Sequence, residues 1–286
     1  MVLITWNIQW GRGLDGRVDL ARIVETARAI ADFDVLCVQE VADNFPAPGL
    51  EGNDDRDQFA ELARLLPGYR RAQAYGVDLP GEAGRRRRFG NAIFSRYGIL
   101  SIRRHALPWP ADPGVGTMPR VALEATLQAP MGAVRVTTTH LEYYSDVQRR
   151  AQAACLREIH AEACERAARP GKATHEGGPF DSTPQTELAI LTGDFNFPPE
   201  HAAYGEIQGP LERGLPRYVD AWPMVHDRHP HTPTFSVHSQ VYAKTPYCCD
   251  FVFVSEPLGP RVRAIRVDSA TTASDHQPVL AEIDDR

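Results

Sequence analysis

The sequence predicts an α/β fold built from mixed β-sheets. Short apolar runs typical of strands outnumber the amphipathic stretches typical of helices. Some of these strands are separated by a helix-length segment and others by a connection short enough for a hairpin, so parallel and antiparallel neighbours are both expected. Because no internal repeat and no linker divides the chain, we expect residues 1–286 to form a single domain.

The first elements alternate between strand and helix. A buried strand is expected at 2–6, and a helix at 17–31, where apolar residues recur at helical spacing. A second apolar strand at 34–39 ends at Glu40. A loop rich in Pro, Gly and Asp follows at 43–56, and a helix is expected at 57–66, before Pro67-Gly68.

The rest of the chain is richer in strands. Strands at 69–75 and 90–95 enclose a polar insertion at 78–88, and several more are expected between 98 and 139. A long helix covers 146–168. Residues 170–186 carry Gly, Pro, Ser and Thr without an apolar period and predict a flexible loop. The last strands are expected near 188–193, 233–237, 249–254, 262–267 and 278–283.

Composition narrows the function classes. The net charge of −6 and the sequence pI of about 5.9 argue against a protein that holds nucleic acid by bulk electrostatics, because such domains usually have a pI above ~9. No run approaches the roughly 18 apolar residues of a membrane span, and no signal peptide is visible. The five cysteines lack zinc-ligand spacing and suit a reducing compartment. We therefore expect a cytoplasmic protein.

One short motif offers an alternative function. Gly11-Arg12-Gly13-Leu14-Asp15-Gly16 fits G-x-G-x-x-G, follows a strand and precedes a helix, and the acidic Glu40 lies 24 positions after Gly16. This pattern is typical of a dinucleotide-binding oxidoreductase. The four residues that separate the strand from Gly11 favour the other interpretation, a turn after which Asp19 or a neighbour begins the helix.

Polar residues accumulate where the apolar strands end. Asn, Glu, His and Asp at such positions are costly unless they converge and satisfy one another or a cation. Their hard oxygen atoms suit Mg²⁺, and the absence of a thiolate among them disfavours zinc. The residues are Asn7, Glu40, His140, Asp194, Asn196, Asp250, Asp275 and His276.

These blocks resemble the endonuclease/exonuclease/phosphatase superfamily, in the family's order and over residues 5–283. They are Thr5-Trp6-Asn7-Ile8, Val38-Gln39-Glu40, Gly90-Asn91-Ala92-Ile93-Phe94-Ser95-Arg96, Thr138-Thr139-His140-Leu141, Gly193-Asp194-Phe195-Asn196 and Ser274-Asp275-His276-Gln277-Pro278-Val279. The resemblance implies a four-layer α/β/β/α sandwich, with two packed mixed sheets between helices, that forms one catalytic domain.

The resemblance also implies a role for each site residue. Glu40 would be the main Mg²⁺ ligand, with Asn7 and Asp275 close to the metal and Mn²⁺ able to substitute. Asp194 would orient and deprotonate the attacking water, which Asn196 helps to position. His276, paired with Asp250, would donate to the phosphoryl oxygen, and His140 would bind a second phosphate oxygen. These parts suit phosphoryl transfer, which depends on positioning and charge neutralisation.

The substrate is less constrained by the sequence. Arg120, Asn91 and Arg88 are candidates for binding substrate phosphate; Arg120 could equally be a surface residue, and the run Arg85–Arg88 either a solvated face or a phosphate contact at the mouth of the site. Tyr143, Tyr144, Trp109 and Trp222 could stack on a base, line an acyl pocket or simply pack in a core.

The function expected from these observations is Mg²⁺-dependent hydrolysis of a phosphodiester by a nuclease-type enzyme. DNA or RNA is the expected substrate, and a monomer without an obligate partner is expected. The alternative within the class is a phosphatase or phospholipase-C-type hydrolase acting on a small phosphoester or a lipid headgroup.

Overall fold

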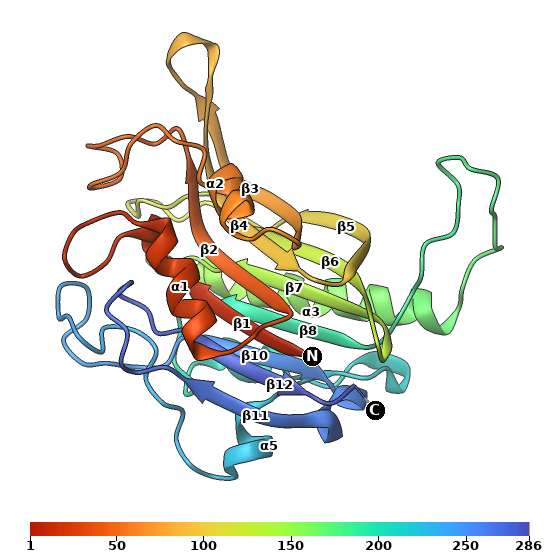
Figure 1. Ribbon diagram of the computed structural model, residues 1–286. Coiled ribbons are helices and arrows are strands. Elements are labelled where there is room, and N and C mark those ends of the chain that lie inside the picture. Colours follow the sequence, from red (N-terminus) through yellow and green to blue (C-terminus); the bar gives the residue numbers. More distant parts are fainter. Residues whose placement is uncertain (286) are drawn as a thin grey trace.

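Two six-stranded sheets lie face to face in the computed structural model, which describes residues 1–285 (Figure 1). The first sheet has the order β11 (Val262–Val267), β12 (Val279–Ile283), β1 (Val2–Asn7), β2 (Val35–Asp43), β4 (Arg86–Ser95), β3 (Arg70–Pro80). The second has the order β5 (Gly98–Ala106), β6 (Val121–Ala129), β7 (Gly132–His140), β8 (Ala189–Asp194), β10 (Asp250–Ser255), β9 (Tyr218–Asp220). Each contains one parallel pair, β1–β2 and β7–β8, among antiparallel neighbours. The predicted mixed sheets are confirmed.

Helices cover the outer face of each sheet. Helices α1 (Leu20–Ile30) and α2 (Gln58–Leu65) pack their apolar sides on the first sheet, and α3 (Asp146–Ala168) and α4 (Ala202–Ile207) pack on the second. The short α5 (Trp222–His226) follows β9. A separate apolar cluster, drawn from both sheets, fills the space between them. The four-layer α/β/β/α order is therefore confirmed.

Strand alternation decides which side chains enter the space between the sheets. In β1, Leu3 contributes to the core between the sheets, whereas Ile4 and Trp6 face the α1–α2 layer. Asn7, in phase with Leu3, therefore projects into the inter-sheet space. The same phase applies to Gln39, whose amide donates to Thr5 Oγ1 at 3.2 Å and to Thr138 Oγ1 of the opposite sheet at 2.8 Å. One end of the inter-sheet core is thus polar.

Some predicted boundaries are wrong. The expected strand at 233–237 is an irregular segment in which Phe235 makes only isolated bridges, to Tyr247 and His276, because Ser236 has a positive φ of 56° that interrupts extended backbone. The polar insertion at 78–88 is mostly strand. β3 and β4 continue through it as a ribbon in which Arg86 Nε donates to Asp78 Oδ1 at 2.8 Å. The short elements α4, α5 and β9 were not predicted.

The glycine motif near the N-terminus is a turn. Gly11 ends a short 3₁₀ segment at Gln9–Gly11, and Asp19 caps α1 by accepting the Arg22 N–H. At Gly11, where φ is +79°, an added Cβ would lie 2.8 Å from Leu20 Cδ2. The turn interpretation is confirmed.

Residues 169–188 connect α3 to β8 without helix or strand and extend away from the sheets (Figure 1). This segment enters β8 at Ala189, the end of the strand opposite Asp194. Within residues 1–285, no helix is both long and apolar enough to cross a membrane.

Candidate active site

The predicted site residues meet at one end of the two sheets. Four strands, β1, β2, β7 and β8, point their carboxyl ends to this edge. β10 runs antiparallel to β8, so its first residue, Asp250, lies opposite the last residue of β8, Asp194. The segment that precedes β12 brings Asp275 and His276 to the same place.

A β-bulge sets the direction of Glu40. The register between β2 and β4 shifts between Val38 and Val41, and Glu40 in the shifted stretch has a φ of 61°. Bulges of this kind redirect a side chain and are frequent beside active sites. Asn7 Nδ2 donates to Glu40 Oε1 and to Asp194 Oδ2, each at 3.0 Å. Asn7 therefore joins a carboxylate of one sheet to a carboxylate of the other.

The glycine before Asp194 has a clear steric reason. Gly193 has a φ of +135°, and a Cβ there would overlap the carbonyl oxygen of Thr139 on β7. Only glycine permits this close approach of β7 and β8. After the strand, Asn196 N–H donates to Asp194 Oδ1 at 2.9 Å, and Asn196 Nδ2 donates to Leu141 O at 2.8 Å. The Gly-Asp-Phe-Asn block thus fixes the Asp194 carboxylate from its own backbone.

His276 is held between two carboxylates. Its Nδ1 lies 2.9 Å from Asp250 Oδ2, and its Nε2 lies 3.5 Å from Asp194 Oδ2. Burial acts to lower the pKa of His276, but the charges of Asp250 and Asp194 outweigh burial and raise the pKa to about 10. The ring is therefore an imidazolium with one N–H on Asp250 and the other directed toward Asp194. Thr234 Oγ1 donates to the same Asp250 Oδ2 at 2.6 Å.

His140 has the opposite protonation. Its Nε2 lies 3.4 Å from Asp194 Oδ2 and its Nδ1 lies 3.9 Å from Glu40 Oε1. Burial, reinforced by the positive charge of Arg120, lowers the pKa of His140 to about 3. This ring is neutral and offers one N–H.

Unpaired negative charge remains around Glu40. Burial, followed by the nearby Asp275 charge, raises the pKa of Glu40 to about 7, and burial raises the pKa of Asp275 as well. Gln9 Nε2 donates to Asp275 Oδ2 at 2.9 Å, while the buried Gln9 Oε1 has no partner within the described part of the chain. Two carboxylates and a free amide oxygen form a donor set that fits a hard divalent cation.

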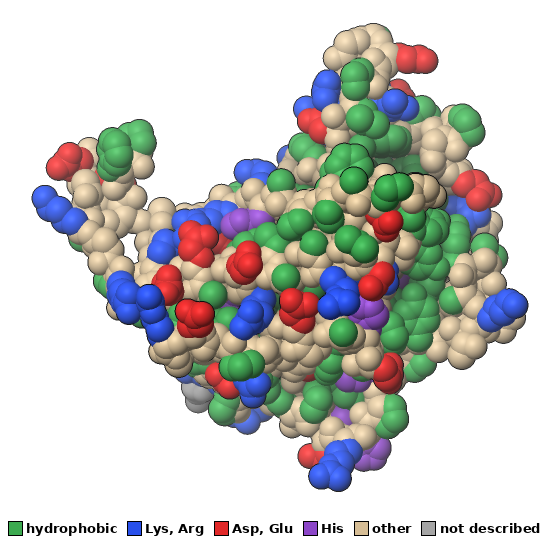
Figure 2. Space-filling model, turned by 180° about the vertical axis from the view of Figure 1, so that it is seen from behind, with side chains coloured by type: hydrophobic (Ala, Val, Ile, Leu, Met, Phe, Trp, Pro, Cys, Tyr) green, Lys and Arg blue, Asp and Glu red, His purple; other side chains and the backbone are tan. Residues whose placement is uncertain are grey.

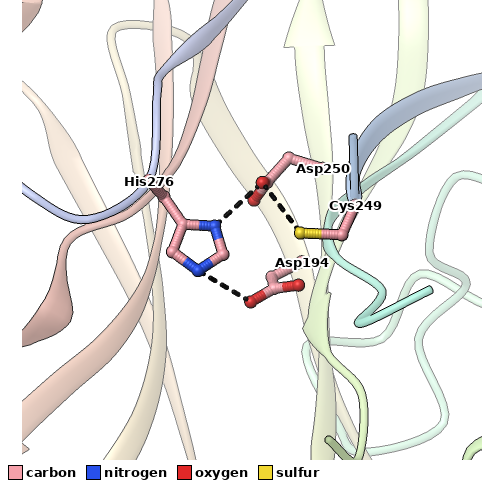
Figure 3. A group of neighbouring side chains, drawn as sticks. All are labelled: Asp194, Cys249, Asp250 and His276. Carbon is pink, nitrogen blue, oxygen red and sulfur yellow. Dashed lines mark hydrogen bonds and ion pairs between the residues drawn. The ribbon is translucent and has the colours of Figure 1, made fainter. Parts of the chain in front are cut away.

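A second group of potential ligand atoms lies beside the first. Ligand atoms of Asp194, Cys249, Asp250 and His276 lie within 4.8 Å of one another (Figure 3). Burial and the carboxylates of Asp194 and Asp250 raise the pKa of the Cys249 thiol well above its usual value, and its Sγ lies 3.5 Å from Asp250 Oδ2. A protonated thiol and an imidazolium are hydrogen-bond donors, so in this protonation state the group forms a hydrogen-bond network and not a ligand set.

The three candidates for phosphate binding lie in different places. Arg120 is buried, its Nε donates to Glu142 Oε2 at 3.2 Å, and it lines the same cavity as Glu40 and Asp194. Asn91 is also buried, its Nδ2 donates to Val121 O at 3.0 Å, and it lines a small adjoining cavity. Arg88 lies on the β3–β4 ribbon, 3.7 Å from Asp43 Oδ2 and with its guanidinium 5.0 Å above the Tyr75 ring. The structure therefore brings Arg120 to the site and places Arg88 outside the cavity.

A cavity of about 290 Å³ opens above these residues. Its floor is polar, and the other half of its lining residues are aromatic or apolar. Trp109 and Trp222, considered above with Tyr143 and Tyr144, are not among the lining residues. The lining residues are Gln9, Trp10, Glu40, Leu50, Phe89, Met118, Arg120, His140, Tyr143, Tyr144, Asp194, Asn196, Phe235, Tyr242, Asp275 and His276. Sequence reasoning did not identify Gln9, Trp10, Thr234, Phe235 or Tyr242 as site residues. Gln9, Trp10 and Tyr242 belong to irregular segments without a periodic signal, and Thr234 and Phe235 lie in a segment that was expected to be an ordinary strand.

Residues 4–276 match the endonuclease/exonuclease/phosphatase family. The chain belongs to this family. Its members are hydrolases that act on phosphate esters, and this protein is accordingly a phosphate-ester hydrolase. The dinucleotide-binding alternative drawn from Gly11–Gly16 is therefore wrong. No curated protein matches the chain significantly.

Solved structures share the fold over nearly the whole chain. An endonuclease/exonuclease/phosphatase from Beutenbergia cavernae is 26% identical, with a TM-score of 0.63, over 98% of this chain and 70% of that chain. A mannosyl-6-phosphatase from Bacteroides thetaiotaomicron is 20% identical, with a TM-score of 0.67, over 99% of both chains. A Neisseria 3′ phosphatase bound to a product DNA hairpin is 20% identical, with a TM-score of 0.61, over 99% of both chains.

Proposed function

We propose that the protein hydrolyses phosphodiesters as a nuclease-type enzyme, by attack of a water that Asp194 activates. A divalent cation held by Glu40 and Asp275 would supply Lewis acidity beside it. The proposal rests on the groups that surround the Asp194 carboxylate. Its carboxylate accepts hydrogen bonds from Asn7 and from the Asn196 backbone and faces the Nε2 of the protonated His276. A fixed base beside a charged donor is what hydrolysis of a phosphate ester requires.

Asp194 and its neighbours then have distinct roles in proton transfer and in stabilising the phosphoryl group. Asn196 positions the attacking water, and Asp194 accepts its proton as the water oxygen bonds to phosphorus. The bond from phosphorus to the leaving oxygen breaks in the same reaction, and that oxygen takes up a proton from solvent water. Imidazolium His276 donates its Nε2–H to a phosphoryl oxygen as negative charge develops, while Asp250 keeps the ring charged and oriented. Neutral His140 donates to a second phosphoryl oxygen.

Glu40 and Asp275 are proposed as the metal ligands, with Mg²⁺ as the metal and Mn²⁺ as a substitute. Asn7 Oδ1 accepts the Gln9 N–H at 3.0 Å while its Nδ2 holds Glu40, so we assign Asn7 to orienting the ligand carboxylate. A cation bound there would supply Lewis acidity and neutralise phosphate charge.

Arg120 is proposed to bind the substrate phosphate. Its Nη1 is buried and has no partner among residues 1–285. A guanidinium with one unused buried N–H group beside the catalytic residues suits a phosphate oxygen. Contacts of substrate phosphate with Asn91 and Arg88 stay predictions, as do a DNA or RNA substrate, the monomeric state and the cytoplasmic location.

Phosphomonoester hydrolysis is a second candidate, favoured by the modest size of the cavity. About 290 Å³ lies near the lower end of the range of ligand pockets, roughly 300–1,000 Å³, and accommodates one phosphate with one attached group.

Hydrolysis of bis(p-nitrophenyl) phosphate and p-nitrophenyl phosphate, with and without Mg²⁺, tests both candidates. We expect EDTA to abolish activity and Asp194→Asn to lower kcat by a factor on the order of 10³. Glu212→Gln, a change at an exposed acidic residue that does not line the cavity, is the control and should retain activity. If Asp194→Asn hydrolysed both esters at the wild-type rate, the proposal would be refuted.

A further inference from the structure

Aromatic rings form most of the wall above the catalytic residues. Phe235 packs on His276 with ring centroids 4.5 Å apart, and Tyr242 lies 6.4 Å from Phe235 in a stacked orientation. Tyr143 Oη donates to the Tyr242 carbonyl at 3.4 Å, and its ring meets Tyr144 edge-to-face at 4.8 Å. Ring contacts therefore lead from the catalytic imidazole through Phe235 to Tyr242. The Tyr143–Tyr144 pair is joined to them by the hydrogen bond from the Tyr143 hydroxyl to the backbone of Tyr242.

A second apolar group completes the lining. It consists of Trp10, Leu50, Phe89 and Met118. The Trp10 indole is fixed in place, because its Nε1 donates to Glu51 O at 3.0 Å and its carbonyl accepts from Gln58 Nε2 at 2.8 Å. This part of the wall is thus held by the loop before α2 and by α2 itself.

The outer rings are exposed, whereas the floor is buried. Tyr144 is 71% exposed and Tyr242 is 50% exposed, although the catalytic residues beneath them are buried. Exposed aromatic groups at the rim of a site typically bury their faces against a ligand. Figure 2 shows apolar side chains gathered along the side of the molecule opposite the projecting 169–188 segment.

The charges of the lining restrict the ligand further. Arg120 is the only Lys or Arg among the lining residues, and it lies at the floor beside Glu142. The other positive charges, the imidazolium of His276 and a cation that Glu40 and Asp275 would hold, also lie at the floor. A substrate with further phosphates against the aromatic walls would therefore leave those charges unpaired. A bare sugar would place hydroxyl groups against aromatic walls with few hydrogen-bond partners.

We infer that this cavity selects phosphoesters that carry a nucleobase close to the scissile phosphate, with the base clamped by Tyr144 and Tyr242. The inference rests on the proposed hydrolysis at the same site. A base is flat and uncharged, stacks on tyrosine faces and presents polar edges to water at the open rim. A free mononucleotide and the terminal nucleotide of a nucleic acid share this chemistry.

Binding without turnover tests the inference. In the Asp194→Asn protein with Mg²⁺, titration calorimetry compares AMP with ribose 5-phosphate, which has the same sugar and phosphate but no base. We expect AMP to bind about tenfold more tightly, the size of one base–aromatic stack. Adding Tyr144→Ala or Tyr242→Ala should remove most of that ratio. Tyr144→Phe should preserve it, and so should Phe180→Ala, an 88% exposed ring on the 169–188 segment.

Three results would overturn the inference: equal affinity for AMP and ribose 5-phosphate, tighter binding of octyl phosphate than of AMP, or a loss in Phe180→Ala as large as in Tyr144→Ala. A 5′-phosphorylated oligonucleotide identifies the source. If this oligonucleotide binds more tightly than AMP, the natural ligand is the end of a nucleic acid. If the two bind equally, the natural ligand is a free nucleotide. Hydrolysis of the p-nitrophenyl esters by the wild-type protein is measured separately. If that hydrolysis is intact but AMP is not preferred, the inference about the base is wrong and the proposed hydrolysis stands.

Discussion

Two histidines lie close to the same oxygen of Asp194, yet their surroundings leave one ring protonated and the other neutral. His276 faces Asp250 and Asp194, and these carboxylates hold its pKa near 10 despite burial. His140 is buried beside Arg120, and its pKa falls to about 3. One ring therefore carries the positive charge needed by a developing phosphorane, and the other donates a hydrogen bond without adding charge.

Asp250→Asn tests the origin of the charge on His276. Without the carboxylate the pKa of His276 falls, so the protonated, active ring is lost at lower pH. We expect the alkaline limb of the kcat–pH profile, set near pH 10 by the raised pKa of His276, to move toward neutral pH, with kcat reduced at pH 8.

The chain offers a matched control for this experiment. Asp220 lies 2.6 Å from His231 Nε2 in a second histidine–aspartate pair, and neither residue lines the catalytic cavity. Asp220→Asn should leave the alkaline limb where it is. An unmoved limb in Asp250→Asn would show that another group controls the alkaline side.

At the scale of elements, the close pairing of β7 and β8 delivers Asp194. Because Gly193 has no Cβ, the Thr139 carbonyl can lie close to it, and the two strands pair closely one residue before the catalytic carboxylate. In Gly193→Ala the new Cβ would force the strands apart and strain a φ of +135°. We expect the free energy of unfolding to fall by about 1–3 kcal/mol and kcat to fall by at least tenfold, because Asp194 shifts relative to His140.

Gly205→Ala separates this effect from glycine replacement in general. Gly205 lies inside α4, and a Cβ there meets no atom within 4 Å, so the substitution should stabilise the protein by about 0.5–1 kcal/mol. Urea unfolding and kcat measured on both variants give the comparison. Equal stability and activity in Gly193→Ala and wild type would contradict the steric argument.

The elements also show what the sequence could predict and why. Buried strands such as β1 and β8 carry an apolar pattern and end in a polar residue, so they and their site residues were found. The segment 233–237 has the composition of a strand, but its apolar Phe235 packs on His276 instead of entering a sheet. Gln9, Thr234 and Tyr242 could not be found, since their roles depend on contacts between segments far apart in the chain. The β-bulge at Glu40 likewise leaves no periodic trace.

At the scale of the whole molecule, the inter-sheet core changes from apolar to acidic at one end. The layered arrangement came from the resemblance of the site blocks, because periodicity alone gave only mixed sheets. The fold collects Glu40, Asp194, Asp250 and Asp275 at that end, while His276 compensates Asp250. Among residues 1–285, Glu40 and Asp275 accept hydrogen bonds from the neutral amides of Asn7 and Gln9 but have no charged partner as close as His276 is to Asp250. Part of the acidic charge is therefore an energetic cost to the metal-free fold.

Thermal unfolding with and without Mg²⁺ measures that cost. Folding raises the pKa of Glu40 from its ordinary value of 4.5 to about 7. Glu40 therefore lowers the free energy of unfolding progressively as the pH rises between these two values, and its destabilising effect is complete above the folded pKa. At pH 8, Glu40→Gln should therefore raise the Tm of the metal-free protein.

Mg²⁺ provides the second half of the experiment. In the wild type, Mg²⁺ at a hundredfold excess over its Kd should add about 2.7 kcal/mol to the free energy of unfolding, a rise of several degrees in Tm that EDTA reverses. Glu40→Gln should lose that rise, whereas Glu212→Gln should keep it. If the metal-free Glu40→Gln protein melted below the wild type, the charge of Glu40 would be balanced by the protein itself. If Mg²⁺ still stabilised Glu40→Gln as much as the wild type, Glu40 would not hold the cation.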